Sequence, residues 1–225
     1  MGTQEEVRPA FYALRRGGLR DYVTLLHPPY TLWHLSYVAI GAALAPHFHL
    51  DRLLWALAAF FLAMGVAAHA LDELKGRPLR TQIPSAALVA IAAVSLAGAV
   101  AIGIGAASAW GWGLLVFVAA GAVLVPAYNL ELALHNDWGF ALAWGAFPAL
   151  TGYFVEAQTI RLEAIAAAVF AFVLSLAQRT LSTPVRRARR EHATVEGIAT
   201  LERALRLLTW ATVALAVALV AARLR

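Results

Sequence analysis

The chain has 225 residues, of which 61% are hydrophobic and only 14% are charged. About a quarter of the residues in a soluble domain are charged, so this composition excludes an ordinary soluble domain and indicates a membrane protein. The lack of cysteine excludes thiolate chemistry and a disulfide-stabilised secreted domain. The formal net charge of +5 is more typical of basic cytoplasmic loops than of a nucleic-acid-binding surface, and we expect no nucleic-acid partner.

The first 28 residues precede the apolar part of the chain and are basic. They carry four arginines but no apolar run, which distinguishes them from a signal peptide. Residues 10–26 form either a short amphipathic helix on the membrane surface or a partly ordered basic tail. We therefore divide the chain into a cytoplasmic basic N-terminal segment, 1–28, and a transmembrane helical domain, 29–225.

Seven stretches are long and apolar enough to be membrane-spanning helices, each of which needs about 20 apolar residues. Alanine and leucine dominate these stretches, and they lack the alternation of a membrane β-barrel. We predict an all-α, polytopic membrane bundle of about seven transmembrane helices. The boundary near residue 110 is the least sharp, because small residues surround it. The predicted spans are residues 29–46, 53–71, 84–104, 110–130, 138–157, 162–181 and 205–222.

Polar side chains gather at one end of the second, fourth and sixth predicted spans. His69 and Asp72 are three residues apart and share a helix face, and Glu131 and His135 share one if the fourth helix continues that far. Carboxylates beside cations such as Lys75 suit a phosphate bridged by Mg²⁺. The alternative is that these groups lie in the headgroup zone, where charge is tolerated. His69 is the best candidate for a functional group within a span.

A weak internal repeat accompanies this clustering. The second span is followed by Arg77-Pro78-Leu79-Arg80, and the sixth by Thr183-Pro184-Val185-Arg186. We expect the first four helices to superpose roughly on the last three, with an eighth helix missing. Both polar turns would then lie at one mouth of a cavity.

Several stretches resemble the UbiA-type intramembrane prenyltransferases, over residues 27 to about 200. The resemblance implies a UbiA-like helical fold that transfers a prenyl group from an isoprenoid diphosphate to a lipophilic acceptor, with Mg²⁺ as cofactor. The first helix of the family, its first Asp-rich motif and its middle region are similar, in that order, to residues 27–45, to Gly65–Gly76, and to Tyr128-Asn129 with Gly145–Tyr153.

The resemblance also implies site residues. Asp72 matches the second Asp of the motif and His69 stands at the first, so both are catalytic candidates. The expected metal ligands are Asp72, Glu73 and Glu131. The expected diphosphate-binding residues are Lys75, Arg77, Arg80 and Arg179. The expected cavity residues are Trp33, Tyr37, Asn129, Trp144, Phe147, Tyr153 and Gln178. Aromatic residues also form belts at the membrane–water interfaces, and such belts would explain these residues without a ligand.

Departures from the family pattern support a second hypothesis. His69 and Gly76 stand where two Asp residues are expected, and the sixth helix ends in Gln178 and Arg179 rather than an acidic pair. The chain is also about two spans shorter than is usual in the family. The alternative is a non-catalytic isoprenoid-binding or lipid-binding protein, or a partner of a membrane complex. A third possibility is a transition-metal site built from His69, Asp72, Glu131 and His135.

The distribution of basic residues predicts the orientation of the chain. With seven spans and a cytoplasmic N-terminus, fourteen of the eighteen Lys and Arg residues lie inside. We expect an integral protein of a prokaryotic plasma membrane with its C-terminus external. A green fluorescent protein fused after Arg225 should stay dark, whereas the same fusion at the N-terminus should fluoresce. A fluorescent C-terminal fusion would contradict this topology.

Overall fold

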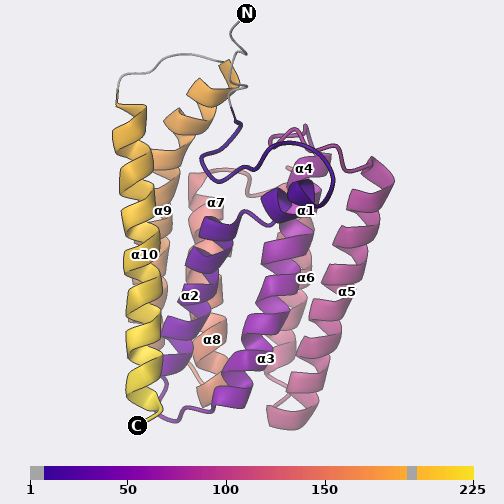
Figure 1. Cartoon of the computed structure of the whole chain (residues 1–225). Coiled ribbons are helices and arrows are strands. Elements are labelled where there is room, and N and C mark those ends of the chain that lie inside the picture. Colours follow the sequence, from indigo (N-terminus) through magenta and orange to yellow (C-terminus); the bar gives the residue numbers. More distant parts are fainter. Residues whose placement is uncertain (1–7, 192–196) are drawn as a thin grey trace, which may run out of the picture.

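The computed structural model describes residues 8–191 and 197–225, and the regular structure in these ranges is helical. Figure 1 shows long helices side by side, with the N-terminal segment at one end of the bundle and the C-terminus at the other. The all-α prediction is confirmed. The helices are α1 Leu19–Leu25, α2 Pro28–Leu44, α3 Leu50–Phe60, η1 Phe61–Ala68, α4 His69–Leu74, α5 Ser85–Trp110, α6 Leu114–Asn129, α7 Asp137–Ala141, η2 Leu142–Ala146, α8 Phe147–Ala157, α9 Leu162–Glu191 and α10 Ile198–Arg223.

Four helical segments in the described part of the chain are long and apolar enough to cross a membrane. They are Leu50–Leu74, Ser85–Trp110, Leu162–Arg189 and Ile198–Arg223. The other three predicted spans fall on the shorter helices α2, α6 and α7 to α8. Length and composition thus support a membrane protein, whereas the count of seven spans stays a prediction.

Gly111 marks the boundary that the sequence left open near residue 110. Its φ of 149° ends α5, and side chains other than glycine rarely adopt such a conformation. The chain then reverses, and α6 begins at Leu114.

Two of the helical rods contain a π-helical segment. η1 joins α3 to α4, and η2 joins α7 to α8. π-helical turns are rare, and they are frequently found at functional sites. The carbonyl oxygen of Gly65, within η1, lies 3.1 Å from Nδ1 of His69 and accepts a hydrogen bond from it. These two segments therefore mark the region where a functional site is expected.

The helices α2 and α8 cross in direct backbone contact. A Cβ atom at Gly41 would overlap the carbonyl oxygen of Ala149, and one at Gly152 would overlap that of Val38. Small residues allow membrane helices to approach this closely, which strengthens their van der Waals contact. This crossing fixes α2 against α8.

A buried hydrogen-bond network beside the crossing connects α9 to α2. Nε1 of Trp33 donates to the hydroxyl oxygen of Tyr37, and Oγ of Ser175 lies 3.3 Å from the same oxygen. Trp33, Tyr37 and Ser175 are all completely buried.

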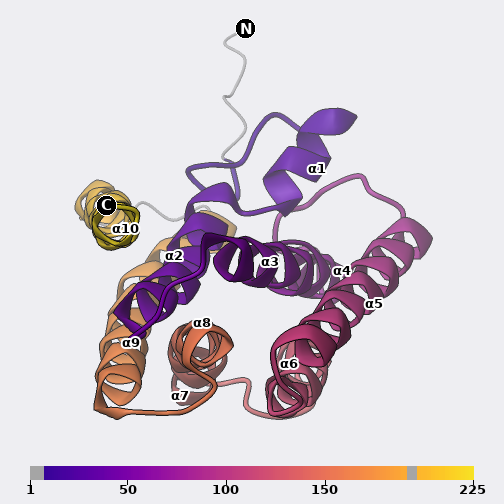
Figure 2. The same ribbon diagram turned by 90° about the horizontal axis from the view of Figure 1, so that it is seen from below.

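In Figure 2, α2, α9 and α10 lie on one side, α5 and α6 on the other, with α3 and α8 between them.

The crossing of α2 and α8 can be tested with a single added methyl group. Gly152→Ala should lower the free energy of unfolding by about 1–3 kcal/mol, the usual cost of overpacking. The matched control is Gly105→Ala, because a Cβ there meets no atom within 4 Å. Alanine is favoured over glycine in a helix, so the control should keep or raise stability. Thermal unfolding of both variants in detergent measures the difference; equal melting temperatures would contradict the prediction.

Candidate functional site

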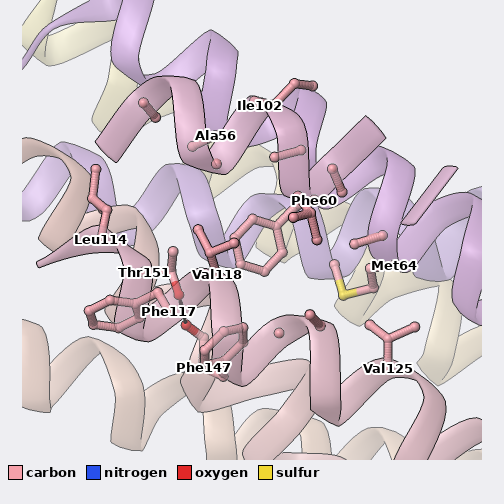
Figure 3. A pocket seen from close by; sticks show the side chains of 18 of the residues that line it. Ala56, Phe60, Met64, Ile102, Leu114, Phe117, Val118, Val125, Phe147 and Thr151 are labelled. Carbon is pink, nitrogen blue, oxygen red and sulfur yellow. Dashed lines mark hydrogen bonds between the residues drawn. The ribbon is translucent and has the colours of Figure 1, made fainter. Parts of the chain in front are cut away.

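An apolar pocket lies between the α3–η1 rod, α5, α6 and the η2–α8 rod. Its cavity volume is about 100 Å³, and it is partly open to its surroundings. Nearly all of its lining side chains are apolar, and the hydroxyl of Thr151 is satisfied by the Phe147 carbonyl at 2.8 Å. Figure 3 labels the lining residues Ala56, Phe60, Met64, Ile102, Leu114, Phe117, Val118, Val125, Phe147 and Thr151.

One end of the pocket reaches Tyr128 at the end of α6. Met64 and Val125 line this end, opposite Leu114 in Figure 3, and they pack in one cluster with Tyr128. Trp144 also lines the pocket, and its ring contacts that of Tyr128 edge to face at 5.6 Å. The pocket therefore ends against a polar side chain.

Tyr128 belongs to a group of polar side chains that we call the polar layer. His34 and Tyr128 both pack against Phe140, with ring centroids 5.7 and 6.0 Å away. The rings of His27 and His69 stack at 4.0 Å and are nearly parallel. Gln178 of α9 is buried too, and it precedes Arg179, whose guanidinium lies over the ring of Phe140. The members of the polar layer are His27, His34, His69, Tyr128 and Gln178.

Four buried atoms of the polar layer have no hydrogen-bond partner among the residues that the structure describes. They are Nε2 of His27, Nδ1 of His34, the hydroxyl oxygen of Tyr128 and Oε1 of Gln178. An unpaired buried polar atom costs about 1–3 kcal/mol. A water molecule or a polar group of a ligand would satisfy such atoms, and that of Tyr128 lies next to the end of the pocket.

The N-terminal segment forms part of this site. The hydroxyl of Tyr12 lies 2.8 Å from Nδ1 of His27, and its ring contacts Tyr30 at 5.6 Å. Arg206 lies over the ring of Phe11 at 4.7 Å. Burial raises the pKa of Tyr12 well above its usual value, and burial together with nearby His69 lowers the pKa of His27. Both side chains are therefore uncharged at neutral pH.

Two ion pairs lie at the rim of the polar layer. Nε of Arg179 is 2.9 Å from a carboxylate oxygen of Asp137, and the guanidinium lies over Phe140 at 5.2 Å. Nζ of Lys75 is 3.9 Å from a carboxylate oxygen of Glu131. In both pairs the positive charge is already balanced by a carboxylate.

Asp72 is electrostatically coupled to groups from the fourth and sixth predicted spans. Its partners include Arg186, His135 and Glu131. The polar ends of the second, fourth and sixth spans thus come together. Arg186 also couples to Tyr12, so this arginine, which the sequence analysis did not select, belongs to the rim.

Two of the predicted site residues stabilise the loop after α4. Glu73 is completely buried, and its carboxylate accepts hydrogen bonds from the backbone amides of Leu79 and Thr81 at 2.9 and 2.8 Å. Arg77 donates to the carbonyl of Ile83 and to Oγ of Ser85. Both side chains therefore serve the local structure. Arg80 lies in the same loop with a positive φ of 55°.

The predicted cavity residues are divided between the pocket and the core. Trp144 and Phe147 line the pocket, and Gln178 belongs to the polar layer. Asn129 is buried and donates to the carbonyl of Val125 at 2.7 Å. Trp33, Tyr37 and Tyr153 are completely buried among the packed helices rather than along the pocket.

The carboxylates of this structure do not fit the Mg²⁺ site that the resemblance implies. Both oxygens of Glu73 are held by the loop, and Glu131 is paired with Lys75 and lies 3.7 Å from His135. Within residues 8–191 and 197–225, no three His, Asp or Glu side chains are placed to hold a metal ion. These residues include His69, Asp72, Glu131 and His135, so the structure does not group them into the alternative transition-metal site either.

His34 was missed by the sequence analysis, although a signal for it was present. It lies inside the first predicted span, and an ionisable residue within a span is a functional candidate. Tyr12 offered no such signal, because it lies in an irregular segment whose contacts depend on the fold.

The chain matches no protein-family model, no curated protein and no solved structure. The resemblance to the UbiA-type prenyltransferases therefore stays an interpretation of the sequence. The function has to be inferred from the pocket, the polar layer and the rim.

The role of Glu73 can be tested by a substitution that keeps its shape. Glu73→Gln removes one acceptor and the charge, and it should lower the free energy of unfolding by about 1.5–3 kcal/mol, the range for a hydrogen bond to a charged group. Glu131→Gln is the matched control, because its exposed pair with Lys75 should contribute at most about 1 kcal/mol. Thermal unfolding in detergent compares them. A larger loss in the control would contradict the assignment.

Proposed function

We propose that this chain is an integral membrane protein that binds an isoprenoid-type lipid, with the apolar chain in the pocket and the polar head at the polar layer. One observation carries the proposal: an apolar pocket between the helices ends beside Tyr128, whose buried hydroxyl has no hydrogen-bond partner among the described residues.

Trp144 connects the two halves of this proposed site. Its side chain lines the pocket and contacts the ring of Tyr128. Tyr128 in turn contacts Phe140, which also contacts His34. A ligand that fills the pocket up to Trp144 would therefore place its head beside Tyr128. This continuity favours an amphipathic ligand over a purely apolar one.

The side chains support lipid binding better than prenyl transfer. Ionisation of an allylic diphosphate needs several positive charges on the leaving group. Arg179 and Lys75 are each paired with a carboxylate, and the carboxylates do not fit a shared metal site. The preferred function is thus the non-catalytic alternative, binding of an isoprenoid lipid. The choice of an isoprenoid over an acyl chain follows the sequence resemblance.

Blocking the pocket tests the proposal. Ala122 lines the pocket, whereas its neighbour Val123 is 65% exposed on the outer face of α6. Ala122→Phe should weaken binding of tritiated geranylgeraniol by tenfold or more, because the added ring occupies ligand volume. The control Val123→Phe should bind like the wild type. Both are measured by equilibrium binding to the full chain in lipid nanodiscs.

Two outcomes would count against this function. Equal binding by the Ala122→Phe and Val123→Phe variants would place the lipid outside the pocket. Release of diphosphate from geranylgeranyl diphosphate in the presence of Mg²⁺, lost in Asp72→Asn, would support the transferase instead.

A further inference from the structure

The short helix α1 is attached to the rest of the molecule by one of its faces. The carboxylate of Asp21 accepts hydrogen bonds from the backbone amides of Gly17 and Gln82, at 2.9 and 2.7 Å. Oγ1 of Thr24 accepts another from the amide of Leu14 at 3.0 Å. Asp21 and Thr24 are both buried. These hydrogen bonds fix which side of α1 is turned inward.

Leu25, on the same inward face, fixes the depth of α1. It belongs to a buried apolar cluster with Ala70 of α4 and with Leu88 and Ala92 of α5. Leu88 and Ala92 lie near the start of α5, which begins at Ser85 and is long and apolar enough to cross a membrane. In a bilayer, α1 would therefore lie beside the beginning of a span, at the level of the headgroups.

The opposite face of α1 is apolar and exposed. Leu19, Tyr22 and Val23 lie three and four residues apart, so they share this face. They are 83%, 43% and 46% exposed, respectively. Figure 2 shows α1 beside α3, α4 and α5 and outside the outline of the long helices. Large apolar side chains that stay exposed together mark an interaction surface.

Basic side chains accompany this apolar face. Arg15 and Arg20 are exposed. The carboxylate closest to them in the sequence, that of Asp21, is turned inward and bound by two backbone amides. The outer side of α1 thus combines apolar side chains with positive charge, which is the composition of a helix that lies in the surface of an anionic membrane.

We propose that α1 docks on the anionic headgroups of the adjoining membrane leaflet. Leu19, Tyr22 and Val23 enter the lipid, and Arg15 and Arg20 bind lipid phosphates. Anionic lipid complements these charges, whereas a second copy of α1 would bring arginines against arginines. The inference needs only the membrane location of the bundle and is independent of what the pocket binds.

Docking of α1 would also affect the polar layer. α1 ends at Leu25, and the chain reaches His27 two residues later. The ring of His27 stacks on that of His69 at 4.0 Å and lies 2.8 Å from the hydroxyl of Tyr12. A docked α1 therefore holds both ends of the N-terminal segment over the polar layer.

Spin labels test the docking in the full chain, because the chain has no cysteine of its own. A nitroxide on Leu19→Cys in nanodiscs should be more accessible to oxygen, which concentrates in lipid, than to a water-soluble nickel chelate. Arg187→Cys, at a side chain of α9 that is 74% exposed, provides the aqueous control. Val94→Cys, at a residue of α5 that is 73% exposed, provides the lipid control.

Hydrogen exchange tests the role of charge. The backbone amides of α1 should exchange more slowly in discs that contain phosphatidylglycerol than in discs of phosphatidylcholine alone. In the anionic discs, Arg20→Gln should speed this exchange by about fivefold, the effect of one arginine near an anionic surface. The matched control is Arg203→Gln, which removes an exposed arginine of α10 and should leave the exchange of α1 unchanged.

Each other outcome has a definite meaning. A label at residue 19 that is as accessible to the nickel chelate as the label at residue 187 would overturn the docking. Equal exchange of α1 in both kinds of disc would overturn the choice of anionic lipid. Spin–spin broadening between labels at residue 19 would assign this face to a second copy of the chain instead. An aqueous signal from residue 94 would overturn the membrane location itself, and with it the proposed function.

Discussion

The backbone contact between α2 and α8 is the constraint on which the rest of the bundle depends. At Gly41 and Gly152 there is no room for a Cβ atom, so these helices meet without intervening side chains. A membrane offers little hydrophobic driving force between helices, and close van der Waals packing has to replace it. Tyr37 then binds Ser175, which adds α9 to the pair. One side of the molecule is therefore tightly closed, and the empty space lies on the other side of α8, towards α5 and α6 (Figure 2).

The two π-helical segments lie in the two rods that face this space. η1 places Met64 against the pocket, and η2 places Trp144 there. A π-helical turn shifts the register of the following residues and leaves backbone carbonyls free for other donors. The Gly65 carbonyl accepts such a hydrogen bond from Nδ1 of His69. The imidazole of His69 is thus oriented by a backbone group.

Much of the fold could be predicted from the sequence, because long apolar stretches in a chain with few charges have no other stable arrangement in lipid. All seven predicted stretches fall on helices. The π-helical segments could not be predicted, since they arise from packing between rods. Glu73 shows the same limit in the site: the resemblance implied a metal ligand, but its hydrogen-bond partners Leu79 and Thr81 are determined by how the loop folds back. Trp144 and Gln178 were selected as an aromatic and a polar residue within spans, and the structure places Trp144 along the pocket and buries Gln178.

The departures from the UbiA pattern are consistent with one another. In a site that ionises a diphosphate, carboxylates would repel the anion by themselves. They contribute only by holding metal ions, which in turn bind the diphosphate. Here an imidazole stands at the first Asp position of the motif, and the positive charge of Arg186 acts on Asp72. At the rim, Arg179 and Lys75 are paired with Asp137 and Glu131, and the side chains that line the pocket are nearly all apolar. An apolar environment of low dielectric penalises an ion that enters it without a partner. The proposed site therefore favours the apolar chain of a lipid over a charged group.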